Sequence, residues 1–175
     1  MRSRALLFAA LTGLACVSLH AGQLLPARLN LALGTVGTLI ATPGTISFQA
    51  TNPNLGTVSG SSSGTVSFFV LGGSHTQGWS VSVQAGSTTF VGCPTIPTSA
   101  VRVSCSGANV SGGAGTGSCN GSFPLSTVSQ QVAGGAEGDG TNSYSVTINF
   151  TLAESWRYVA NPSCSFTLTY TVNAQ

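Results

Sequence analysis

Residues 144–152 have the sequence YSVTINFTL, a strict alternation of apolar and polar side chains. The apolar positions are all large, and the polar positions between them carry only hydroxyl or amide groups. Successive side chains of a β-strand point to opposite faces, so this period of two predicts a strand with one buried face and one polar face.

A similar alternation recurs along the chain in residues 29–33, 46–48, 66–70, 79–83, 101–103 and 164–172, although Phe69 and Leu71 make the run at 66–70 apolar on both faces. Clusters of Gly, Pro, Asn and Ser separate these runs and are typical of turns, for example at 52–54 and 60–64. The Gly-rich residues 107–121 are expected to be the least ordered loop. Together these signals predict an all-β fold, an antiparallel β-sandwich of about seven to nine strands.

The composition of the 175-residue chain excludes several classes of protein. Only 5% of the residues are charged and 42% are hydrophobic, while Gly, Ser and Thr together contribute 69 residues. A coiled coil needs far more Ala, Glu and Lys, and a nucleic-acid-binding protein needs a basic stripe. The apolar content suffices for one buried core, so a single domain is expected.

The N-terminus has the pattern of a secretory signal peptide. A basic start with Arg2 and Arg4 precedes the apolar run 5–17, and Ala21 offers a small residue for cleavage. The run is shorter than the roughly 20 residues of a membrane span, and no second long apolar segment follows, so no transmembrane segment is expected in the mature chain. A buried N-terminal helix and a lipoprotein cleaved before Cys16 are the alternatives. The predicted division is a signal peptide (1–21), an N-terminal extension with the first strand (22–44) and the sandwich domain (45–175).

Removal of residues 1–21 leaves a chain with no formal net charge. Three arginines then balance three carboxylates, so the apparent basicity of the sequence belongs to the signal and implies no acidic partner. These six residues are Arg28, Arg102, Arg157, Glu137, Asp139 and Glu154.

Four cysteines remain after the predicted cleavage: Cys93, Cys105, Cys119 and Cys164. An even number of cysteines in an exported chain predicts disulfides. The pairing Cys93–Cys105 with Cys119–Cys164 is favoured, since the first pair flanks a Pro-containing connection between two strand-like runs; the other connectivities stay open. A zinc site would need Cys-x-x-Cys spacing, which is missing, so neither a metal nor another cofactor is expected.

Three segments resemble motifs that carry chemistry in other proteins, but none predicts a catalytic residue. GSSSG at 60–64 matches the nucleophile-elbow pattern, but a strand-like run rather than a helix follows it. His75, the one His of the predicted mature chain, is expected to be a solvated loop residue, because a general base would need an orienting partner. EGDGTN at 137–142 is interpreted as a turn, with a Ca²⁺-binding loop as the alternative.

Trp156, Arg157 and Tyr158 are the candidate ligand-binding residues. Two aromatic rings and a guanidinium can stack on a sugar ring or anchor a protein contact. If the alternation of the preceding strand continued, both rings would instead be buried as a cap on the core.

Two resemblances accompany these patterns. FTLTYTV at 166–172 is similar to the ending of WxL-type cell-surface domains, with Tyr170 where those domains carry Trp. The runs at 46–53, 64–68 and 79–86 resemble the rhythm of spore-coat-U-type, pilin-like domains, although Cys93 comes later than the usual first cysteine of that family. The second resemblance implies extracellular fibres built by chaperone–usher assembly.

The sequence therefore predicts an exported, non-enzymatic structural or adhesive protein of the bacterial envelope or extracellular matrix. One alternative is a pilin-like fibre subunit in which residues 28–36 complete a neighbouring subunit, and another is a carbohydrate-binding module that uses Trp156 and Tyr158. The expected partners are the protein itself, other envelope proteins or polysaccharide, but not nucleic acid.

Overall fold

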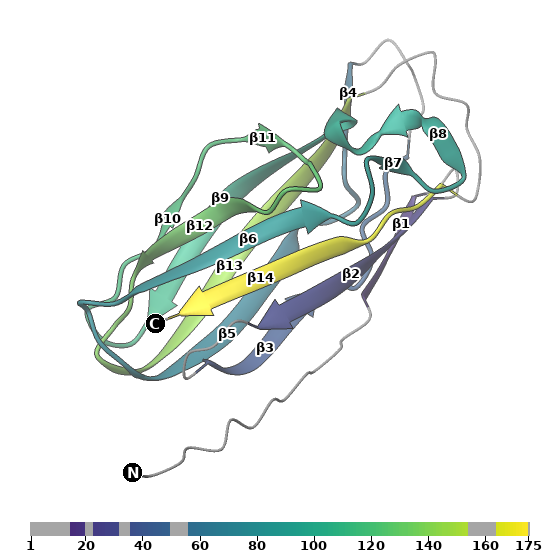
Figure 1. Cartoon of the computed structure of the whole chain (residues 1–175). Helices are drawn as coiled ribbons and strands as arrows, with labels where there is room; N and C mark the ends of the chain where they lie inside the picture. Colours follow the sequence, from purple (N-terminus) through teal and green to yellow (C-terminus); the bar gives the residue numbers. More distant parts are fainter. Residues whose placement is uncertain (1–14, 20–22, 32–35, 50–55, 154–163, 175) are drawn as a thin grey trace.

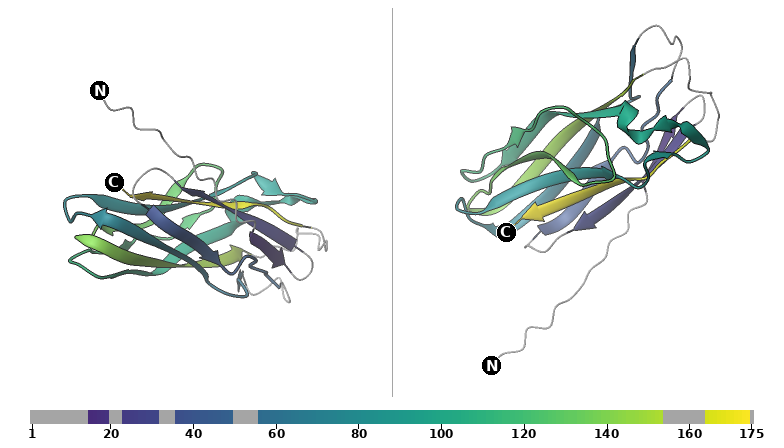
Figure 2. Two further views of the ribbon diagram at one scale, coloured as in Figure 1. Left: turned by 90° about the horizontal axis from the view of Figure 1, so that it is seen from below. Right: turned by 45° about the horizontal axis from the view of Figure 1, so that its top comes forward.

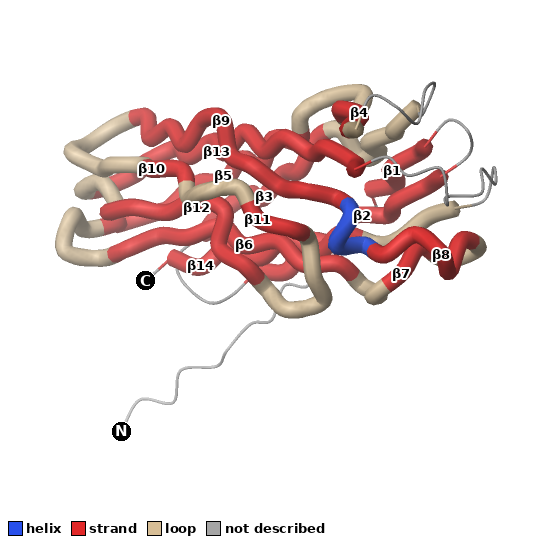
Figure 3. The backbone as a smooth tube through the Cα atoms, turned by 90° about the horizontal axis from the view of Figure 1, so that it is seen from above, coloured by secondary structure: helices blue, strands red, loops and turns tan. Residues whose placement is uncertain are grey.

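A computed structural model of the chain describes residues 15–19, 23–31, 36–49, 56–153 and 164–174, with the main chain alone for 15–31. This part of the chain consists of β-strands, turns and one short 3₁₀ segment, η1 (Thr98–Ala100), which joins β8 to β9 in Figure 3. The strands are β1 (Ala15–Leu19), β2 (Gln23–Leu31), β3 (Val36–Thr42), β4 (Thr57–Ser59), β5 (Gly64–Gly73), β6 (Gly78–Ala85), β7 (Thr89–Phe90), β8 (Cys93–Pro97), β9 (Val101–Ser111), β10 (Ser118–Cys119), β11 (Phe123–Pro124), β12 (Gln130–Ala136), β13 (Gly140–Ala153) and β14 (Leu168–Ala174).

The strands form two large sheets and a small hairpin. The first sheet has the order β1-β2-β14-β6-β12-β10, and the second has the order β11-β9-β13-β5-β3, with β4 also paired to β13. Figures 1 and 2 show these sheets as two layers, with the hairpin β7–β8 at one end. All the pairings are antiparallel except that of β2 with β14, which is parallel. The predicted all-β, antiparallel sandwich is confirmed.

β13 is the longest of the described strands and contains the alternating run 144–152. It lies between β9 and β5 in the second sheet. From Asn142 to Ala153 its side chains alternate between the core and the outer face. The predicted buried positions 144, 146, 148, 150 and 152 are all buried, and the polar positions between them face outward. The alternation of apolar and polar residues, with its period of two, therefore determines which face of the second sheet packs against the core.

Aromatic rings fill one part of the core. Phe68 of β5 stacks on Tyr144 of β13 with ring centroids 4.8 Å apart, and Trp79 of β6 meets both rings edge-on. Phe90 and Phe166 make a second edge-on pair at 4.6 Å. Each such pair adds about 0.5–1.5 kcal/mol to the stabilisation that the buried area provides.

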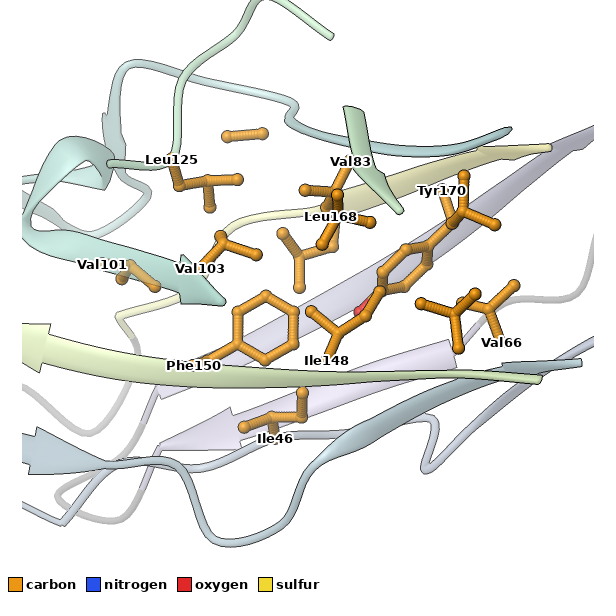
Figure 4. Close-up of a cluster of buried hydrophobic side chains, with 14 of the residues drawn as sticks. Ile46, Val66, Val83, Val101, Val103, Leu125, Ile148, Phe150, Leu168 and Tyr170 are labelled. Carbon is orange, nitrogen blue, oxygen red and sulfur yellow. The ribbon is translucent and has the colours of Figure 1, made fainter. Parts of the chain in front are cut away.

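Aliphatic side chains from both sheets fill the rest of the core. Val83 and Leu168 of the first sheet face Ile148 and Phe150 of the second, as Figure 4 shows. The Tyr170 ring enters this cluster, and its burial raises the pKa of its hydroxyl. One continuous core thus holds the two sheets together.

The cysteines form two disulfides, but the predicted pairing is wrong. The bonds are Cys93–Cys164 and Cys105–Cys119. Cys93 opens β8, and the neighbouring Val91 pairs with Ser165, so the β7–β8 hairpin lies against the segment that leads into β14 rather than against β9. Cys105 of β9 is joined to Cys119 of β10, which connects the two large sheets.

Three further segments differ from their predictions. Ile46 and Phe48 are buried in the core, but residues 43–49 form no strand. The run predicted over 164–172 becomes a strand only from Leu168 onward. The Gly-rich residues 107–121 are not one loop: β9 continues to Ser111, and β10 follows at Ser118–Cys119.

The segment 22–44, predicted as an extension with the first strand, contributes a strand to each sheet. β2 lies beside β14 in the first sheet, and β3 lies beside β5 in the second. Leu29 and Leu31 lie in β2, whereas Leu33 is outside the described residues.

Candidate functional site

Trp156, Arg157 and Tyr158 lie outside the described residues, so their role stays a prediction. The GSSSG segment at 60–64 forms a turn that leads directly into β5. Its Ser61 N–H donates to the Ser47 carbonyl, and its Ser63 hydroxyl hydrogen-bonds the Asn149 side chain. Because a strand follows, the elbow geometry of a hydrolase nucleophile is not formed there.

One cluster of polar side chains lies at the end of the sandwich where two turns meet. His75 is in the turn between β5 and β6, and Asp139 is in the turn between β12 and β13. The His75 main-chain N–H donates to Asp139 Oδ1 at 3.0 Å, and the ring Nδ1 lies 2.9 Å from both carboxylate oxygens. The two side chains are 62% and 60% exposed, so His75 is solvated, as predicted, but it also has an orienting carboxylate.

Glu137, two residues before Asp139, is fully buried. Its main-chain N–H donates to the Gln77 carbonyl, and the Gly138 N–H donates to the Tyr144 hydroxyl at 3.1 Å. Burial raises the pKa of Tyr144, the Gly138 hydrogen bond lowers it, and the nearby Glu137 charge raises it further. The burial of Glu137 is not predictable from the sequence, because nothing in the local pattern distinguishes Glu137 from the exposed Asp139.

Asn142 closes the same turn from the start of β13. It is buried, and its Nδ2 donates to the carbonyls of Asp139 and Gly140, each at 3.3 Å. Within the described residues, no group of three or more His, Cys, Asp or Glu side chains gathers as a metal site would. Residues 137–139 form a turn, as predicted, and 140–142 begin β13. The Asn142 amide bonds the main chain of this turn, whereas the Asp139 carboxylate contacts His75.

The contacts described for this cluster connect parts of the chain to one another. The Asp139 contacts fix the orientation of the His75 ring, as a carboxylate hydrogen-bonded to an imidazole generally does. Here the carboxylate and the ring come from different turns, so the contact joins the β5–β6 turn to the β12–β13 turn.

The outer faces of the sheets are a second candidate site. In the second sheet, Thr42, Thr65 and Thr147 lie opposite one another on β3, β5 and β13, which makes a row of hydroxyl groups across three strands. In the first sheet, Ser82 lies opposite Thr171. Among the strands β3 to β14, whose side chains the structure describes, Arg102 is the one charged residue.

Among the strands whose side chains are described, large exposed apolar side chains interrupt the hydroxyl rows at one place. Ile40 of β3 is 50% exposed, and Phe69 and Leu71 of the neighbouring β5 are 43% and 51% exposed. Phe69 and Leu71 point outward because their neighbours Phe68 and Val70 face the core. The outer face of the second sheet thus carries a small apolar patch, Ile40, Phe69 and Leu71, beside its β3 edge.

Comparisons of the chain with protein-family models, with curated proteins and with solved structures find no significant match. The resemblances to WxL-type and spore-coat-U-type domains stay predictions. In the part of the chain that the structure describes, no helix is long and apolar enough to cross a membrane.

Proposed function

We propose that the protein is an exported, non-enzymatic structural or adhesive component of the bacterial envelope or extracellular matrix. The observation that supports this most is the hydroxyl-rich outer face of the described strands, β3 to β14, on which Arg102 is the one charged residue. Such faces offer hydrogen-bonding groups without the charge repulsion that keeps most soluble proteins apart. The two disulfides are compatible with an oxidising compartment outside the cytoplasm.

Export and surface function can be tested together in a bacterial host that produces the full chain. We expect a processed form beginning at Gly22 in the envelope or medium, with increased attachment of the cells to surfaces or to one another. The matched control lacks residues 2–21 and should stay inside the cell without this effect. An unprocessed cytoplasmic chain with reduced cysteines, or a secreted chain without any effect on attachment, would contradict the proposal.

A pilin-like fibre subunit is the second candidate, and the pairing of β2 supports it. Residues 27–31 of β2 pair with β14, whereas residues 23–26 pair with β1 alone, and β1 lies inside the predicted signal peptide. Cleavage after Ala21 would therefore remove the strand partner of residues 23–26. After this cleavage, β2 would be held to its own sheet only by the five residue pairs with β14. A strand held in this way can leave its own β14 and pair with β14 of a neighbouring subunit.

Deletion of residues 22–36 distinguishes the two candidates. A self-contained domain should lose stability without becoming dependent on protein concentration. A fibre subunit should instead form heat-resistant polymers at full length, lose them on deletion, and accept the peptide 28–36 when it is added separately. Size-exclusion chromatography with light scattering, before and after heating, measures both outcomes.

A further inference from the structure

The edges of the two large sheets differ in how they are protected. One edge of the first sheet is β10 and one edge of the second is β11, and each of these edge strands has only two residues; the other edge of the first sheet is β1. Very short edge strands prevent another chain from adding to a sheet. The opposite edge of the second sheet is β3, which has seven residues and, among the described strands, pairs only with β5.

β3 also lacks the side chains that usually block an edge. Its sequence, VGTLIAT, contains no charged residue and no proline, and Pro43 follows its last residue. A register shift between Val36 and Leu39 makes its beginning irregular, but Leu39–Thr42 pair regularly with β5. Natural edge strands of this length normally carry Lys, Pro or an inward-pointing charge.

The apolar patch defined above lies on this edge. Ile40 is half exposed on β3 itself, and Phe69 and Leu71 lie on the adjacent strand of the same face. An added strand would cover Ile40 while its main chain pairs with β3, so apolar burial and main-chain hydrogen bonding favour the same event.

We propose that β3 is a self-association edge, at which two copies of this chain join their second sheets by antiparallel pairing of β3 with β3. Pairing centred on Ile40 places Ile40 of one copy opposite Ile40 of the other, and Thr38 opposite Thr42. On the inner face, Leu39 of one copy lies opposite Ala41 of the other. The same residues serve both copies, so the contact has two-fold symmetry and closes as a dimer.

A second copy fits this edge better than a charged partner does. β3 and β5 carry no charged residue, so two such edges meet without repulsion and a charged strand finds no counter-charge there. Figure 1 shows β3 at the margin of its sheet, with β5 beside it. The inference goes beyond the proposed function and does not depend on it, because an adhesive protein can be a monomer.

The first test places a lysine on the edge. We expect the purified chain to sediment as a dimer that dissociates on dilution, and Ile40→Lys to sediment as a monomer at the same concentrations. The matched control is Val128→Lys, at an apolar position that is 71% exposed outside the sheets, which should remain a dimer. Circular dichroism spectra of the two variants, recorded at a concentration at which the parent is dissociated, should show the same folded state.

The second test is specific to the register. Opposite residues of an antiparallel pair have Cα atoms about 4.5–5.5 Å apart, which suits a disulfide. Ile40→Cys, treated with diamide as the oxidant, should therefore give a covalent dimer on a non-reducing gel, and Val128→Cys should not. A parent chain that is monomeric at all concentrations without cross-linking at position 40 would overturn the proposal, and so would open-ended polymers in place of a closed dimer.

Discussion

Asp139 holds His75 at two points, through the main-chain N–H and through the imidazole ring. The hydrogen bond from the His75 main chain lowers the pKa of Asp139 most, the bond from the ring lowers it next, and a small burial effect opposes both. The residues belong to turns that are 64 positions apart in sequence, so the contact joins distant parts of the chain at one end of the sandwich.

This contact predicts an acid-dependent contribution to stability. The folded chain binds the Asp139 proton less tightly than the unfolded chain, so the contribution is present above the ordinary carboxyl pKa and is lost as the pH falls through the lowered pKa. Asp139→Asn should lower the melting temperature slightly near neutral pH, and the difference should vanish in acid. Ser74→Ala, in the same turn as His75, is the control and should keep the parent's pH profile; identical profiles for Asp139→Asn and the parent would refute the role.

The aromatic cluster predicts a strong contrast between two adjacent phenylalanines. Phe68→Ala removes a ring that is buried between Tyr144 and Trp79 and should cost about 3–5 kcal/mol in free energy of unfolding. Phe69→Ala, one position further on the same strand, removes an outward ring and should change stability by about 0.5 kcal/mol or less. Urea denaturation of both variants measures the difference, and equal costs would contradict the assignment of faces.

Gly117 is predicted to be irreplaceable for reasons of space. A Cβ at this position would lie 2.3 Å from the Ala108 carbonyl oxygen and 3.1 Å from the Trp79 ring. Gly117→Ala should therefore cost about 1–3 kcal/mol, as overpacking does elsewhere. Gly121→Ala introduces a Cβ with nothing within 4 Å and should be nearly neutral. Thermal denaturation distinguishes the two, and a neutral Gly117→Ala would mean that this segment packs differently.

The two disulfides are predicted to differ in their access to a reductant. Cys93 and Cys164 are buried in the core, whereas Cys119 is exposed on the short strand β10. Labelling of the exported, denatured chain should find no free thiol, and mild reduction of the native chain should release Cys105 and Cys119 first. Peptide mapping checks the pairing. Stoichiometric labelling of two or more cysteines before reduction would refute the disulfides.

Trp156→Ala tests the carbohydrate-binding alternative. If Trp156 binds a glycan, the variant should lose retention on a polysaccharide column while its melting temperature is unchanged. If the ring caps the core, the variant should lose about 3–5 kcal/mol of stability instead. A large loss of stability, together with a parent chain that binds no polysaccharide, would reject the module.

The alternation of side chains predicts the fold because it reports which face of a strand is buried. It identifies the core positions of β13 and the paired faces of β5 and β6. It fails for Ile46 and Phe48, because burial needs only contact with the core, whereas a strand needs a neighbouring main chain to pair with.

The contacts between distant turns could not be predicted in the same way. His75 and Asp139 are in contact because the β5–β6 turn and the β12–β13 turn lie at the same end of the sandwich. The position of these turns depends on the order of the strands in the sheets. The disulfide pairing depends on the same information: Cys105 is closer to Cys93 in sequence, but the β7–β8 hairpin lies beside the segment that contains Cys164. The side chains of 156–158 remain a prediction, since they lie outside the described residues.

The Cys93–Cys164 bond spans 71 residues, and Cys105 and Cys119 both lie within that span. A chain that leaves the cytoplasm N-terminus first exposes Cys93 to the oxidising machinery before its true partner has emerged, and Cys105 is the first thiol offered to it. Oxidation in order of arrival would thus join Cys93 to Cys105 and leave Cys119 to Cys164. If the protein is exported as proposed, formation of the native pairing therefore needs either delayed oxidation of Cys93 or a disulfide isomerase that exchanges the early bond.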